Sequence, residues 1–251
     1  MSKSKRVDNE TGYVELLKSK KRNSDWDSRN KNFLQFFSIL ASEEPSLGTF
    51  VDLCAGTGSM FSVVAPLVKL NKWVAIDRDP ECIEVWNDIK KDNPTDINIE
   101  VYGIDCLDFR TPEKITSAYF DPNTFSIHKK YDKTWEQIGE LLNNNNIEHM
   151  AFVDTACYYF RIKGDGSPYG CMTFDNYIEA HQAKLNSLTN DHYELMFYSE
   201  YSSRKCGQFF YKKIRSNQEF EKIRKYKASG HYQKFVQELP KKIDQTKGGL
   251  F

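Results

Sequence analysis

Short apolar runs alternate along the chain with longer segments in which apolar residues recur at helical spacing. Runs of this length, closed by turn-forming residues, favour buried strands. Strands are predicted at TFVDLCAG (49–56), WVAID (73–77), INIEVYGID (97–105), ITSAYFD (115–121) and EHMAFVDTA (148–156). Helices are predicted over residues 27–42, 61–69, 80–92, 131–144 and 173–188.

Near the C-terminal end, the alternation gives way to two consecutive apolar runs. YELMFYSEY (193–201) and GQFFYKKI (207–214) predict two strands joined by a turn. Alternating strands and helices predict a mostly parallel sheet with helices on both faces, and the final pair predicts an antiparallel hairpin at one edge. The expected fold is therefore an α/β domain with seven strands over residues 27–214.

Basic segments flank this predicted domain, at residues 1–26 and 215–251. The chain has a net charge of zero, but residues 1–22 carry seven Lys or Arg against three acidic residues, and residues 201–234 carry ten against two. Either these ends contact a phosphate backbone or they are solvated helix surfaces. Residues 217–245 predict one or two amphipathic helices, which either clamp nucleic acid beside the active site or pack apolar side chains on the sheet. Those apolar side chains are Phe220, Ile223, Tyr226 and Phe235.

Composition narrows the class of protein. The 251 residues are 39% hydrophobic and 28% charged, as in ordinary globular proteins. No apolar run approaches the roughly 20 residues that span a bilayer, and the charged start lacks a secretory signal. We therefore expect a cytoplasmic, intracellular protein with no membrane partner.

The six scattered cysteines form no CxxC pair, so we expect reduced thiols, with Cys54, Cys106 and Cys157 packed as small hydrophobes.

A glycine turn follows the first predicted strand. VDLCAGTGS places Gly56 and Gly58 where the backbone can approach a ligand closely. Asp77 ends the next strand and can accept hydrogen bonds from ribose hydroxyls, while Asp105 ends the third strand at the same edge. A dinucleotide fingerprint needs a third glycine at residue 61, which is Phe61, so a nucleoside cofactor without a pyrophosphate fits better.

The segment DLCAGTGS resembles the first motif of class I S-adenosylmethionine-dependent methyltransferases, especially the nucleic-acid amino-methyltransferases, which read D-x-x-A-G-[ST]-G-[ST]. The resemblance implies a Rossmann-like fold and S-adenosylmethionine as cofactor. It implies that the methionine part is framed by Asp52, Ala55, Gly56 and Gly58, the ribose held by Asp77, and the adenine contacted by Asp105 and Cys106.

The segment AYFDPNTF, at the end of the fourth predicted strand, resembles the family's [DN]-P-P-[YFW] motif in part. Asp121 and Pro122 match the first two positions, where the family accepts hydrogen bonds from the target amine. Asn123 replaces the second proline, and Phe125 stands one residue after the aromatic position. Either Phe125 stacks on the base from a looser turn or Asn123 contacts the base edge. The alternative is that Asp-Pro-Asn only terminates the strand.

The fifth predicted strand is followed by further candidate substrate contacts. Tyr158, Tyr159 and Arg161 lie in DTACYYFR, ahead of a glycine-rich loop. Aromatic and arginine side chains can hold a flipped or single-stranded base, although each tyrosine can equally pack against a helix. The five histidines have no metal-ligand spacing, and we expect no metal.

These features together predict a methyltransferase that modifies an exocyclic amine of a base, with adenine favoured, in DNA or RNA. Nucleic acid is the expected partner. The alternatives are methylation of another kind of substrate, and a non-catalytic cofactor-binding or nucleic-acid-binding protein on the same fold, such as a regulatory subunit.

Overall fold

The computed structural model describes residues 48–58, 60, 61, 65, 69–93, 95–121, 131–154, 174–201 and 206–228. The strands are β1 Thr49–Asp52, β2 Lys72–Ile76, β3 Asn98–Tyr102, β4 Lys114–Phe120, β5 Asn146–Asp154, β6 His192–Tyr201 and β7 Cys206–Ile214. The helices are α4 Pro80–Lys91, the 3₁₀ helix η1 Cys106–Asp108, α5 Tyr131–Asn144, α6 Phe174–Leu188 and α7 Asn217–Ala228. The helix predicted over 27–42 and most of that predicted over 61–69 lie outside the described residues.

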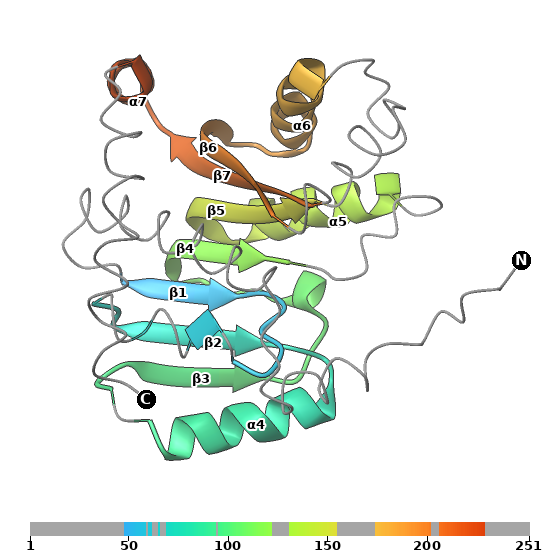
Figure 1. The fold of residues 1–251 in the computed structure, drawn as a ribbon, viewed down its shortest axis with the longest axis vertical. Helices are drawn as coiled ribbons and strands as arrows, with labels where there is room; N and C mark the ends of the chain where they lie inside the picture. Colours follow the sequence, from blue (N-terminus) through green and yellow to red (C-terminus); the bar gives the residue numbers. More distant parts are fainter. Residues whose placement is uncertain are drawn as a thin grey trace, which may run out of the picture.

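The seven strands form one sheet in the order β3-β2-β1-β4-β5-β7-β6. Strands β1 to β5 are parallel, β7 is antiparallel to β5, and β6 is antiparallel to β7 at the edge. The predicted parallel sheet with a terminal antiparallel hairpin is confirmed. The arrowheads of β1 to β4 point the same way, so their carboxyl ends share one edge of the sheet (Figure 1).

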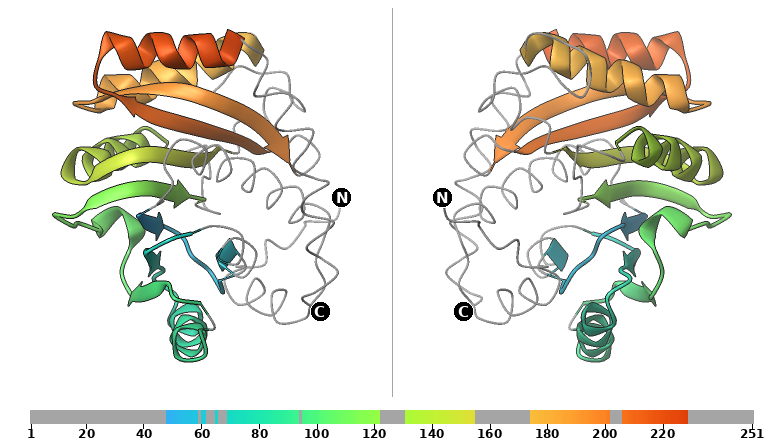
Figure 2. Two further views of the ribbon diagram at one scale, coloured as in Figure 1. Left: turned by 90° about the vertical axis from the view of Figure 1, so that its left-hand side faces the viewer. Right: turned by 90° about the vertical axis from the view of Figure 1, so that its right-hand side faces the viewer.

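Each face of the sheet carries its own hydrophobic cluster, as expected for strands buried on both sides. On one face, Trp73 of β2 stacks against Trp86 of α4 with ring centroids 6.3 Å apart. On the other face, Trp135 of α5 stacks on Phe152 of β5 at 5.2 Å. His181 of α6 lies 3.7 Å from the ring of Phe209 in that same cluster. Helices therefore cover both faces, and Figure 2 shows α5 alongside β5 and α4 below β3.

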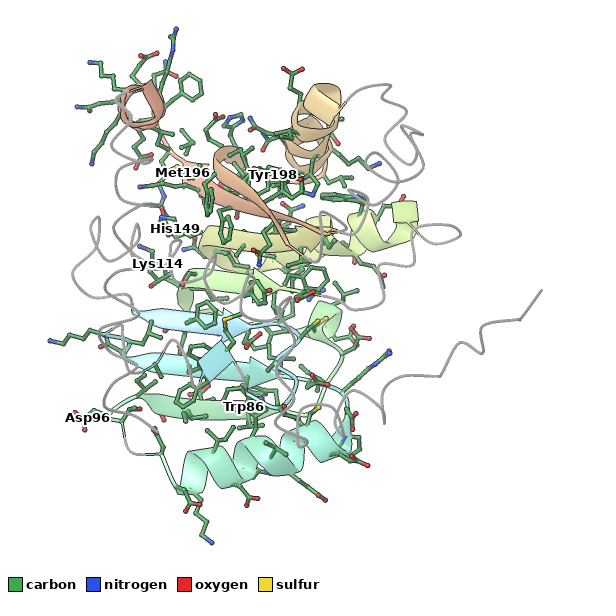
Figure 3. All side chains as sticks on the ribbon, viewed as in Figure 1. Trp86, Asp96, Lys114, His149, Met196 and Tyr198 are labelled. Carbon is green, nitrogen blue, oxygen red and sulfur yellow. The ribbon has the colours of Figure 1, made fainter. Side chains whose placement is uncertain are left out.

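Helix α4 returns the chain from the carboxyl edge after β2. Asp79 caps it, because its carboxylate accepts a hydrogen bond of 2.9 Å from the Glu81 amide. Pro80 suits the first helical position, and Lys90 and Lys91 complement the negative end of the helix dipole. Figure 3 shows Trp86 between this helix and the sheet.

Helix α7 lies on the side of the sheet where the parallel strands begin, opposite to the side where their carboxyl ends lie (Figure 1). Just before it, Arg215 makes two hydrogen bonds, of 2.9 and 2.5 Å, to the buried carboxylate of Glu148 near the start of β5. Lys114, at the start of β4, lies on this side of the sheet (Figure 3) and 3.7 Å from Glu148. The hypothesis that the basic tail clamps a substrate beside the active site therefore does not hold for α7.

The predicted packing of the α7 side chains is correct in part. Ile223 is buried, whereas Phe220, about one helical turn earlier, is 37% exposed. Tyr226 and Phe235 have no described side chains. None of the helices in the described ranges is long and apolar enough to cross a membrane.

Candidate functional site

Aspartates line the carboxyl ends of four adjacent strands. In sheet order they are Asp105 after β3, Asp77 after β2, Asp52 at the end of β1 and Asp121 after β4. Asp52 pairs in register with Ala75 and with Tyr119. Asp77 lies two residues beyond Ala75, and Asp121 lies two residues beyond Tyr119. Because alternate residues of a strand share a face, both carboxylates lie on the same face of the sheet as Asp52. Asp52 and Asp121 are buried, whereas Asp77 and Asp105 are partly exposed.

The turn after β1 is tied to both neighbouring strands. The Leu53 amide donates to the Tyr119 carbonyl at 2.8 Å, and the Ala55 amide donates to the Ile76 carbonyl at 3.0 Å. Ala55 itself is buried. The turn is therefore fixed between the carboxyl ends of β2 and β4.

The two glycines of this turn both have left-handed backbone conformations. The φ angle is 52° at Gly56 and 77° at Gly58. A Cβ at Gly58 would lie 2.4 Å from Cδ1 of Ile89 in α4. The sequence pattern correctly identified a tight strand-to-helix turn, and Gly58 is needed there for backbone conformation and for packing.

Asp77 connects this turn to the start of α4. Its Oδ2 accepts a hydrogen bond of 2.8 Å from the Gly56 amide, and its Oδ1 accepts one of 3.0 Å from the Asp79 amide. A carboxylate has about four acceptor positions, so two remain for a ligand. Asp77 therefore fixes the glycine turn and can still accept hydrogen bonds from a diol.

Asp105 caps the short helix η1. Its Oδ1 accepts a hydrogen bond of 3.0 Å from the Leu107 amide, and the Cys106 thiol lies 3.7 Å from the same oxygen. Its Oδ2 lies 3.8 Å from Nη1 of Arg78, whose side chain is 60% exposed. The structure thus brings Asp105 and Cys106 to the edge occupied by Asp77, as the sequence predicted, and adds Arg78.

Two thiols meet across the end of β2. The Cys54 thiol donates to the Cys106 sulfur at 3.7 Å. This hydrogen bond and burial, with a further contribution from the nearby negative charges of Asp121 and Asp77, raise the pKa of Cys54 well above its usual value. Both cysteines pack against the second cluster but remain partly exposed. They are therefore only in part the small hydrophobes that were predicted.

Asp121 is held at the end of β4 by a residue that the sequence reasoning missed. The Tyr119 hydroxyl donates a hydrogen bond of 3.1 Å to Oδ2 of Asp121, in a buried environment. The sequence did contain a signal for this contact, because Tyr119 and Asp121 are two residues apart along a strand and such residues share a face.

The remaining predicted catalytic and substrate contacts lie outside the described residues. They are Pro122, Asn123, Phe125, Tyr158, Tyr159 and Arg161. Within the described ranges, no group of three or more His, Cys, Asp or Glu side chains is arranged to hold a metal ion.

Comparison of the sequence with protein-family models gives no match, and comparison with curated proteins gives none either. Comparison of the structure with solved structures does give matches. The N-methyltransferase NodS from Bradyrhizobium japonicum WM9, in complex with S-adenosyl-L-homocysteine, is 12% identical with a TM-score of 0.55, over 81% of this chain and 99% of that one.

Two further solved structures are similar. An S-adenosylmethionine-dependent methyltransferase from Clostridium acetobutylicum ATCC 824 is 12% identical with a TM-score of 0.52, over 80% of this chain and 96% of that one. The small RNA methyltransferase HEN1 is 14% identical with a TM-score of 0.52, over 75% of this chain but 26% of that one. The chain therefore has the Rossmann-like fold of these methyltransferases.

Proposed function

We propose that this protein binds S-adenosylmethionine along the carboxyl edge of β3, β2, β1 and β4 and transfers its methyl group to an exocyclic amine of a nucleic-acid base, with adenine favoured. The observation that carries the proposal is the Asp77 carboxylate. It binds the Gly56 amide at 2.8 Å and has Asp105 on one side and Asp52 and Asp121 on the other.

The residues present fit this cofactor. The partly exposed Asp77 retains acceptor positions for the two ribose hydroxyls. Asp105 and Cys106 lie next along the edge, where the adenine would be contacted. Asp52, with Ala55, Gly56 and Gly58, would frame the methionine part. The buried carboxylates of Asp52 and Asp121 favour a ligand with positive charge near β1 and β4.

When bound, the cofactor supplies a methyl group on a positively charged sulfur, which is a good leaving group. The protein then has to position the amine and exclude water. Asp121 is 8% exposed and directly follows β4, beside the end of β1. Its carboxylate would accept a hydrogen bond from the target amine, which raises electron density on the nitrogen and aligns it. Pro122 and either Phe125 or Asn123 would complete that contact.

Nucleic acid as substrate is supported by the DPNTF segment, by the basic segment at residues 1–22 and by the fold shared with a small RNA methyltransferase. Tyr158, Tyr159 and Arg161 would hold the base from the loop after β5. A non-catalytic binding protein on the same fold is the alternative outcome of the experiments below.

The cofactor is tested by calorimetric titration with S-adenosyl-L-homocysteine. Wild-type protein should bind, and Asp77→Ala should bind at least about tenfold more weakly, because a charge-assisted hydrogen bond contributes about 1.5–3 kcal/mol. Asp88→Ala, on the exposed side of α4, is the matched control and should bind normally. No binding by the wild type would refute the proposed cofactor.

Catalysis is tested by transfer of radiolabelled methyl to mixed single-stranded and double-stranded DNA and RNA. We expect incorporation by the wild type, and a loss of at least about tenfold in Asp121→Ala at saturating cofactor, with the affinity for the uncharged S-adenosyl-L-homocysteine retained. Cofactor binding without transfer to any of these substrates would favour the non-catalytic alternative. Transfer unaffected by Asp121→Ala would remove Asp121 from the mechanism.

A further inference from the structure

Two cysteines from distant segments face each other at the edge that carries the proposed cofactor site. Cys54 belongs to the turn after β1, and Cys106 begins η1 after β3. Their sulfurs are 3.7 Å apart, although the residues are 52 positions apart in the sequence. Since β2 lies between β1 and β3, the pair spans the end of β2, where Asp77 emerges.

The two thiols contact each other and a neighbouring carboxylate. Each cysteine keeps part of its surface exposed. The Cys54 thiol donates to Cys106, and the Cys106 thiol in turn lies 3.7 Å from an oxygen of the Asp105 carboxylate. Because the Cys54 thiol donates its hydrogen to the Cys106 sulfur, Cys106 is placed as the first nucleophile and Cys54 as the resolving thiol.

A disulfide requires the sulfurs to approach to about 2.05 Å. Neither cysteine belongs to a strand: Cys54 is in a turn, and Cys106 is the first residue of a single 3₁₀ turn. Hydrogen bonds of the Leu53 and Ala55 amides hold the turn on both sides of Cys54, so side-chain rotation and a shift of η1 would bring the sulfurs together, with the hydrogen-bonded sheet intact.

We propose that Cys54 and Cys106 form an oxidisable dithiol, and that its disulfide closes the cofactor site. The regulatory consequence rests on the proposed function, whereas the disulfide itself does not. The oxidant is a low-molecular-weight disulfide. The Cys106 thiolate attacks one of its sulfurs and expels one thiolate, giving a mixed disulfide. The Cys54 thiolate then attacks the Cys106 sulfur and expels the second. Two electrons pass to the reagent, and the two protons leave on its two released thiols.

Closure follows from the place of the bond. The Cys106 thiol would leave Asp105, and η1 would be pulled toward the glycine turn across the end of β2. This is where Asp77 and Asp105 would receive the ribose and adenine. The disulfide form should therefore bind S-adenosyl-L-homocysteine at least about tenfold more weakly, a free-energy difference of about 1.4 kcal/mol.

The test uses full-length protein treated with oxidised glutathione and then alkylated, with peptide mass mapping. We expect a Cys54–Cys106 linkage in the wild type. Cys54→Ser should instead accumulate glutathione on Cys106, because the resolving thiol is absent. Cys82→Ala, which changes a buried cysteine of α4, is the matched control and should still form the linkage. Failure to form the linkage in folded wild-type protein would overturn the proposal.

Cofactor binding is then titrated in the oxidised wild type before and after reduction with dithiothreitol. Affinity should return on reduction, in the wild type and in the Cys82→Ala control alike. Equal affinity of the oxidised and reduced wild type would overturn the closure. If the reduced protein does not bind the cofactor, both the proposed function and the closure are overturned. Mass mapping would still show whether Cys54 and Cys106 form a disulfide.

Discussion

Tyr119 and Asp121, two residues apart along the end of β4, are joined by a hydrogen bond of 3.1 Å from the tyrosine hydroxyl to the carboxylate. Both side chains are buried, with exposed fractions of 2% and 8%. In the proposed reaction, Tyr119 is therefore a positioning residue that fixes the orientation of Asp121.

Tyr119→Phe should slow methyl transfer with little change in cofactor affinity. A hydrogen bond to a charged group contributes about 1.5–3 kcal/mol, so the rate should fall about tenfold or more. Tyr193→Phe is the matched control, because that buried hydroxyl donates to the Ile147 carbonyl at 2.9 Å near the opposite edge. It should lower stability and leave the rate per folded molecule unchanged. A wild-type rate in Tyr119→Phe would contradict the positioning role.

Gly58→Ala should destabilise the protein through its backbone. A φ angle of 77° costs a side-chain-bearing residue about 1–2 kcal/mol, and the new methyl group would also displace Ile89. Gly103→Ala is the control, because its nearest neighbour would be 3.6 Å away, an ordinary contact. The free energy of unfolding in urea measures both. Ile89→Val can be added to Gly58→Ala, and any stability that it recovers measures the steric part of the loss. Equal stability of Gly58→Ala and Gly103→Ala would contradict the expectation.

Arg215→Met should destabilise the attachment of α7 to the sheet. Glu148 is 3% exposed and would lose its two hydrogen bonds from the guanidinium. Breaking a fully buried pair costs about 3–5 kcal/mol; because the Arg215 side chain is 46% exposed, we expect about 1–2 kcal/mol. Arg224→Met, which removes a surface pair with Glu221, should change the free energy of unfolding by less than about 0.5 kcal/mol. Equal effects would show that burial of Glu148 does not matter.

Acidification should destabilise the fold through His181. Burial holds the pKa of His181 well below its usual value, so the folded state leaves this side chain neutral while the unfolded chain binds a proton below about pH 6.5. The free energy of unfolding should therefore fall by about 1.4 kcal/mol per pH unit below that value.

Urea unfolding between pH 7.5 and pH 5 measures this slope. His181→Phe keeps an aromatic ring beside Phe209 and should flatten the pH dependence, whatever its effect at neutral pH. Parallel pH profiles for wild type and His181→Phe would contradict the assignment.

Most of the fold could be predicted because its strands are buried on both faces and appear as apolar runs closed by turn residues. The strand ends were predicted too long. The run 49–56 continues past Asp52 because Leu53 and Ala55 are also buried, although they belong to the turn. The run 97–105 likewise extends past Tyr102 into the loop that leads to η1.

The site could be predicted where its residues follow strand ends, as Asp77 does. Contacts between distant turns could not be predicted, because they depend on strand order: Cys54 and Cys106 meet only because β1 and β3 flank β2. The position of α7 was also hidden, because the basic composition of a helix does not reveal which edge of a sheet it occupies. The antiparallel direction of β7 places it away from the aspartates.

The position of the four-residue strand β1 between β2 and β4 has a consequence for folding. β1 pairs on one side with β2, which follows it closely in the sequence. On its other side it pairs with β4, where Phe50 lies opposite Ser117. The second pairing closes a long loop that contains β2, α4 and β3. Local pairings form readily, whereas closure of this loop is entropically slow. The four aspartates share one edge only after that closure. A cofactor bound across them would bridge strands whose pairing closes this long loop, and would therefore stabilise the domain against global unfolding rather than against local fraying.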